Sequence, residues 1–76
     1  METPRDRYYE LVLEKIKADR YPSGELMDRL EMALASRDEA EAYLDVLLDK
    51  IQDDRYPSKQ MLDRVLTLAT ALDQAG

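Results

Sequence analysis

The sequence predicts an all-α protein, a small four-helix bundle made of two duplicated helix-turn-helix units (α-hairpins). Two observations lead to this prediction. The pentapeptide DRYPS occurs twice, at residues 19–23 and 54–58. On both sides of each copy, apolar residues recur at the three- and four-residue spacing of an amphipathic helix rather than alternating as they do in a strand.

The repetition extends beyond the pentapeptide, because residues 8–36 align with residues 43–71 and mostly place apolar residues on apolar ones. Repeated units of this size usually bury their apolar faces on one another, and two units are too few for an open solenoid. We therefore expect one domain over residues 1–76, with repeat units at about 4–36 and 37–75. The period is near that of the tetratricopeptide repeat, but the Trp, Gly and Ala signature of that family is absent.

Local signals set the expected helix ends. Thr3 is suited to cap the first helix, and Pro4 to occupy its first position. Ser36 and Glu39 match a capping box at the start of the third helix. Because no glycine or proline interrupts residues 25–56, the second and third helices could instead fuse at Ser36. The expected helices lie near 4–19, 24–35, 37–53 and 59–74.

The two DRYPS copies are interpreted as structural turns. Proline disfavours the α conformation in the residue before it and so ends one helix, while the serine that follows is placed to cap the next helix. The tyrosine rings are expected to cover the open ends of the hairpins. The turn residues are Tyr21, Pro22, Ser23, Tyr56, Pro57 and Ser58.

Metal binding and catalysis are not expected. In a calcium-binding EF-hand reading of the first copy, Tyr21 and Leu30 occupy ligand positions that require oxygen donors, and Lys59 replaces the turn glycine in the second copy. The chain has no cysteine or histidine, so His-dependent activation of a serine is excluded. Ser23 and Ser58 lack the Asp-Ser-Leu context of phosphopantetheine carriers. We therefore predict a non-enzymatic protein without a cofactor.

The formal net charge of −6 disfavours binding to nucleic acid and to anionic membranes. No segment approaches the length of a membrane span, and the first residues do not resemble a secretory signal. We expect a cytoplasmic protein.

Surplus apolar surface is the one feature that suggests a function. On the first and third helices, apolar residues cover roughly 200° of the circumference, about twice what packing in a small bundle requires. Either these helices are central and touch neighbours on two sides, or the flanks form an interface. The candidate interface residues are Leu11, Leu13, Val46, Leu48, Tyr8 and Tyr43.

We therefore expect a protein–protein interaction module (a small adaptor, regulator or assembly factor) that binds a protein partner of unknown identity and forms a homodimer. The alternative is a nucleic-acid-linked regulator, either a helix-turn-helix binder or an acidic DNA mimic that acts on a DNA-binding protein. The third helix carries an acidic run that suits a basic partner, formed by Asp38, Glu39, Glu41, Asp45 and Asp49.

Overall fold

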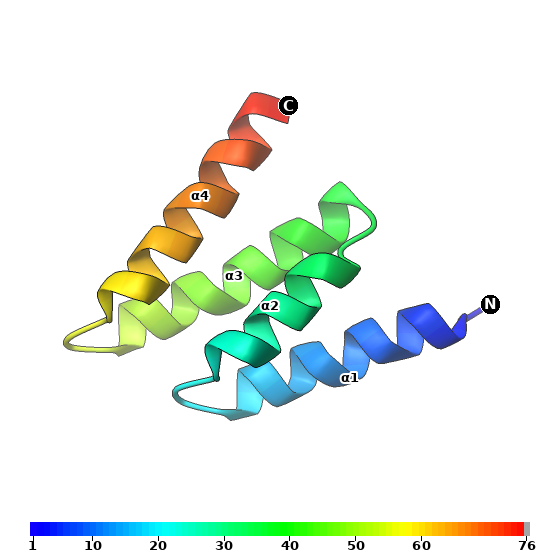
Figure 1. Ribbon diagram of the computed structural model, residues 1–76, viewed down its shortest axis with the longest axis horizontal. Coiled ribbons are helices and arrows are strands. Elements are labelled where there is room, and N and C mark those ends of the chain that lie inside the picture. Colours follow the sequence, from blue (N-terminus) through cyan, green and yellow to red (C-terminus); the bar gives the residue numbers. More distant parts are fainter. Residues whose placement is uncertain (76) are drawn as a thin grey trace. The chain divides into compact units, whose positions relative to one another are not determined.

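A computed structural model describes residues 1–75 and confirms the all-α class, because this range contains four helices and no strand (Figure 1). The expected and observed helix ends differ by no more than two residues. None of the helices within residues 1–75 combines the length and apolar character needed to cross a membrane. The helices are α1 (Pro4–Ala18), α2 (Gly24–Ala33), α3 (Arg37–Asp53) and α4 (Lys59–Ala75).

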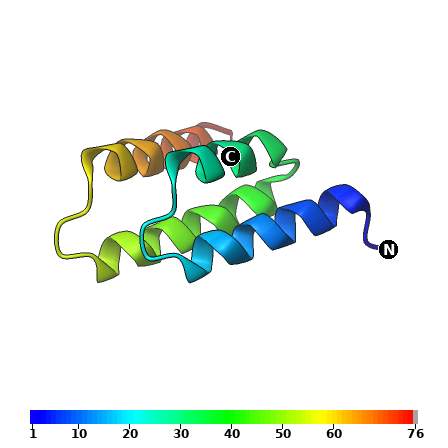
Figure 2. The same ribbon diagram turned by 60° about the horizontal axis from the view of Figure 1, so that its bottom comes forward.

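The chain divides into two compact units, Met1–Ala35 and Ser36–Gly76. In the first unit α1 packs against α2, and in the second unit α3 packs against α4. Within each unit the second helix turns back over the first after a short connecting loop (Figure 2). The division falls next to the boundary expected from the repeat. The expectation that the whole chain closes into one four-helix bundle stays a prediction.

The chain is not helical between Ala33 and Arg37, so α2 and α3 are separate helices and the fused alternative is wrong. Leu34 and Ser36 both have extended backbone conformations. The Ser36 hydroxyl oxygen accepts a hydrogen bond from the Glu39 backbone N–H at 3.2 Å. The first turn of a helix leaves several backbone N–H groups without a partner, and this bond supplies a partner for one of them. It therefore favours the start of a new helix at Arg37 over the continuation of α2.

The two DRYPS segments occupy the connections between the helices of each unit. Asp19 and Asp54 end α1 and α3 in the same extended conformation, with ψ angles of 124° and 126°. Neither connection uses a left-handed residue, since no residue with positive φ occurs within residues 1–75. These helices therefore end without the glycine that often follows a helix, and the bend is made by extended residues leading to a proline.

Hydroxyl side chains cap the start of every helix. Ser23 accepts from the Leu26 N–H at 3.1 Å, and Ser58 accepts from the Met61 N–H at the same distance. Thr3 forms a complete capping box, in which its hydroxyl accepts from the Asp6 N–H at 3.0 Å and its own N–H donates to the Asp6 carboxylate at 3.2 Å. The acid at this position also suits the positive end of the helix dipole.

The core consists of apolar side chains at three- and four-residue intervals on the helices. Four of them, from α1, α2 and α3, are completely buried: Ile16, Leu30, Tyr43 and Leu47. The α4 helix contributes less, because only Val65 is buried on it although the helix is rich in Leu and Ala. The remaining buried side chains of the helices are Tyr9, Val12, Met27 and Ala40.

Replacing Ser58 with alanine should lower the free energy of unfolding by about 1 kcal/mol, because the Met61 N–H loses its acceptor. Urea denaturation at fixed protein concentration measures this change. Thr70→Ala is the matched control, since Thr70 is exposed in the interior of the same helix. There alanine should be neutral or slightly stabilising. Equal losses in the two variants would show that Ser58 does not act as a cap.

Candidate interaction surface

An exposed row of side chains runs along α1 beside its buried face. Tyr9, Val12 and Ile16 are buried, whereas Tyr8 and Leu11 keep 44% and 51% of their surface exposed. Successive residues of a helix are rotated by about 100°, so Tyr8, Leu11 and Lys15 share one side of the helix and form the flank of the buried side that carries Val12 and Ile16. Two large apolar side chains thus lie next to each other in solvent.

The candidate interface residues of α3 are less uniform. Leu48 is exposed, whereas Val46 on α3 and Leu13 on α1 are half-buried. Tyr43 is completely buried and therefore cannot contribute to a surface, although it aligns with Tyr8 in the repeat. The candidate surface therefore does not include Tyr43. Equivalent positions in the two units carry the same residue in different environments.

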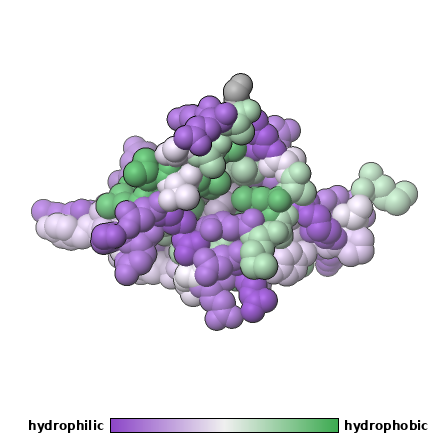
Figure 3. Space-filling view, turned by 45° about the horizontal axis from the view of Figure 1, so that its top comes forward, coloured by the Kyte–Doolittle hydropathy of each residue, from purple (hydrophilic) through white to green (hydrophobic). Residues whose placement is uncertain are grey.

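The α4 helix adds exposed apolar side chains that the sequence analysis did not select. Leu62 and Leu66 are both exposed and lie four residues apart, on one side of the helix. The space-filling view shows hydrophobic residues at several places on the visible surface (Figure 3). The only sequence signal for this exposure is that α4 carries apolar residues on more sides than one packing face needs.

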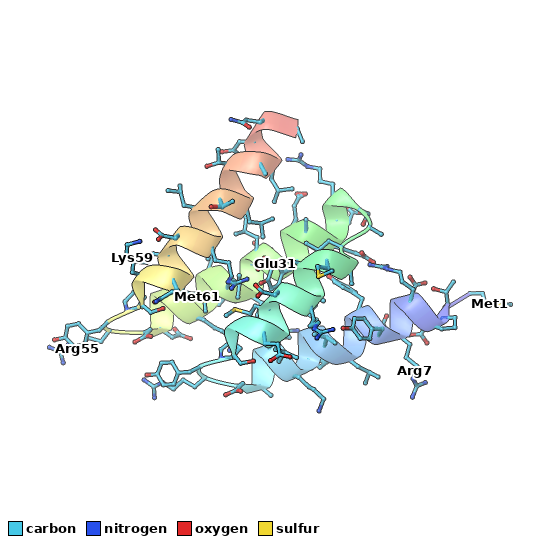
Figure 4. All side chains as sticks on the ribbon, in the orientation of Figure 1. Met1, Arg7, Glu31, Arg55, Lys59 and Met61 are labelled. Carbon is cyan, nitrogen blue, oxygen red and sulfur yellow. The ribbon has the colours of Figure 1, made fainter. Side chains whose placement is uncertain are left out.

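The tyrosines of the two turns are exposed, at 66% for Tyr21 and 80% for Tyr56, so the expectation that their rings cover the hairpin ends is wrong. Each ring instead lies against the preceding arginine, with the Arg55 guanidinium carbon 5.7 Å from the Tyr56 ring centre and a similar 5.4 Å in the first unit. Arg55 extends outward beyond the loop (Figure 4). The prolines are less exposed than the tyrosines, since Pro22 is buried and Pro57 is half-buried.

Acidic side chains form a row on α3. Asp38, Asp45, Asp49 and Asp53 are exposed and lie seven, four and four residues apart, so they share one side of the helix. None of these four carboxylates takes part in an ion pair among residues 1–75. Glu41 differs, because Arg37 lies 3.5 Å from its carboxylate and also donates to the Leu72 carbonyl oxygen at 2.9 Å.

The charges beside the apolar row of α1 are mostly positive. Arg7 and Lys15 form no ion pair among residues 1–75. Glu14, the nearest acid in sequence to Lys15, lies 3.7 Å from Lys17. Farther round the helix, a hydrogen bond with Glu2 and the negative charge of Glu2 raise the pKa of Glu10, and the charge of Arg7 acts in the opposite direction.

The turns do not have the side chains of a calcium loop. Leu30, which stands where the bidentate glutamate of such a loop would lie, is completely buried, and the equivalent Val65 is also buried. Within residues 1–75 no three acidic side chains are grouped as metal ligands.

Comparisons of the chain with protein families, with characterised proteins and with solved structures found no match.

The different environments of the two equivalent tyrosines can be tested by truncating each. Tyr43→Ala should lower the free energy of unfolding by about 3 kcal/mol or more, because a buried aromatic ring leaves a cavity. Tyr8→Ala should cost less than about 1 kcal/mol in dilute protein, because that ring already contacts solvent. Chemical denaturation below the concentration at which the protein associates measures both values. Equal costs would contradict the assignment of Tyr8 to the surface.

Proposed function

We propose that this protein is a non-enzymatic protein–protein interaction module, a small adaptor, regulator or assembly factor, that associates with itself as a homodimer. The exposed pair Tyr8 and Leu11 on α1 carries this proposal. A buried Leu is more stable by about 1.5–3 kcal/mol than an exposed one. Burying this pair against a second molecule therefore stabilises the complex relative to the isolated chain. Tyrosine is also enriched among the residues that dominate binding energy at protein interfaces.

The small size of the chain supports self-association. A chain this small without cysteine gains no stability from disulfides, and oligomerisation is one of the remaining ways to reinforce a small core.

The two units are proposed to be copies of one helix-turn-helix ancestor. They share the DRYPS connection with the serine cap at its end, and a buried aliphatic residue at Leu30 and Val65. In this account the duplicated segment serves the fold, since its proline and serine have structural roles in both units. The exposed apolar surface, which differs between the units, serves binding. We place the module in the cytoplasm on its composition alone.

A second candidate function is an acidic DNA mimic that occupies a DNA-binding protein. The acidic row of α3 favours it, because carboxylates four residues apart on a helix are separated by about 6 Å along the axis. This row also suits a basic protein partner. The two candidates differ in their targets, since a mimic binds the basic groove of a DNA-binding protein and is displaced by DNA. Competition between DNA and the chain for such a protein separates them.

The homodimer can be tested with one substitution on α1. Leu11→Glu should give a folded monomer, because an exposed glutamate is well solvated in the free chain but costly to bury in an interface. Sedimentation equilibrium at tens of micromolar protein measures the mass, and circular dichroism verifies the helix content.

Leu66→Glu provides the matched control, because Leu66 is an equally large exposed residue on α4. This variant should remain a dimer like the wild-type protein. A wild-type monomer at these concentrations would overturn the proposal. A dimer that Leu66→Glu disrupts and Leu11→Glu does not would move the interface to α4.

A further inference from the structure

We infer that the outer face of α1 binds the acidic row of α3 of a second copy of this chain, and that opposite charges select this pairing. This inference rests on the proposed homodimer and specifies its chemistry. The basic face is defined as Tyr8, Leu11 and Lys15 with Arg7 beside them. The acidic face is defined as the exposed aspartates Asp38, Asp45, Asp49 and Asp53 with Leu48 beside them.

Each face combines exposed apolar surface with charges mainly of one sign, since the acid beside Arg7 on the basic face, Glu14, is paired with Lys17. On the basic face, Arg7 extends from α1 on the side opposite α2 (Figure 4). Lys15 follows Tyr8 by seven residues and Leu11 by four, so the ammonium group and both apolar side chains lie on one side of the helix. On the acidic face, Leu48 lies three residues after Asp45 and so occupies the edge of the row.

Charges on the two faces have matching spacings. Arg7 and Lys15 are about 12 Å apart along the axis of α1, and Asp45 and Asp53 are also about 12 Å apart along the axis of α3. Two helices packed along their lengths can therefore bring the cations of one face against the carboxylates of the other. The apolar residues supply the buried contact, and the charges exclude a pairing of two basic or two acidic faces.

A symmetric dimer uses this pairing twice. In a dimer with a two-fold axis, a contact from residue i of one protomer to residue j of its partner is always accompanied by the reverse contact. Each protomer offers one basic face and one acidic face, so a two-fold dimer can use both. A partner of another sequence would need to supply both charge patterns, whereas a second copy already carries them.

The experiment reverses the charges of one face at a time. One variant combines Arg7→Glu with Lys15→Glu, and the other combines Asp45→Lys with Asp49→Lys. Both variants should keep their helices, because glutamate and lysine are good helix formers. Within the first variant, an acid at Arg7 is favourable near the N-terminal end of α1, whereas an acid at Lys15 is less favourable in its last turn. Alone, each variant would place like charges against one another in both contacts, and its dimer should be at least about 10-fold weaker.

An equimolar mixture of the two variants should form a heterodimer with at least the affinity of the wild-type dimer, since both contacts then join opposite charges. Native mass spectrometry distinguishes the heterodimer from the homodimers by mass. The control combines Arg55→Glu with Lys59→Glu, which makes the same charge change at the α3–α4 connection and should leave the wild-type homodimer intact.

The outcomes separate this inference from the proposed function. If the wild-type protein is a dimer and both variants remain homodimers of unchanged affinity, the charge pairing is wrong and self-association stands. If the wild-type protein is a monomer at every concentration measured, both the charge pairing and the proposed homodimer are wrong. The salt dependence of the wild-type dimer gives an answer even if a variant does not fold. Its dissociation constant should rise several-fold between about 0.05 M and 0.5 M salt, and a constant value overturns the pairing.

Discussion

The connection between the two helices of each unit is the constraint on which the rest of the structure depends. An extended aspartate ends one helix, and a proline prevents that helix from continuing. A serine then begins the next helix, because its hydroxyl oxygen accepts a hydrogen bond from the backbone N–H of the third residue of the new helix. Because these three devices act within five residues, the helices must turn back at this point. Their apolar sides then meet within the unit, as the contacts between α1 and α2 and between α3 and α4 show.

This constraint has a consequence for the surface. Once a short connection fixes how two amphipathic helices meet, only one side of each can pack against the other. Apolar residues on the remaining sides must be covered in another way or stay exposed, and Leu11 on α1 and Leu66 on α4 are exposed. The proposed interaction therefore follows from helices that carry more apolar surface than a two-helix unit can bury.

The sequence predicted the helices well, because their ends are set by local chemistry. Thr3, Ser23 and Ser58 cap helices in the structure as their sequence contexts indicate. Exposure was predicted less well, since it depends on packing between segments that are distant in the chain. Tyr8 and Tyr43 have the same identity and equivalent positions, yet one is exposed and the other buried. No pattern within either helix distinguishes them, and the same limitation applies to Leu62 on α4.

The central claim, that the outer face of α1 is an interface between copies of this chain, is tested most directly by intermolecular nuclear Overhauser effects in a mixture of isotope-labelled and unlabelled protein. The account predicts intermolecular signals from the Leu11 methyl groups and the Tyr8 ring to the Leu48 methyl groups. Intermolecular signals confined to Leu62 and Leu66 would contradict it, as would a complete absence of intermolecular signals at millimolar protein concentration.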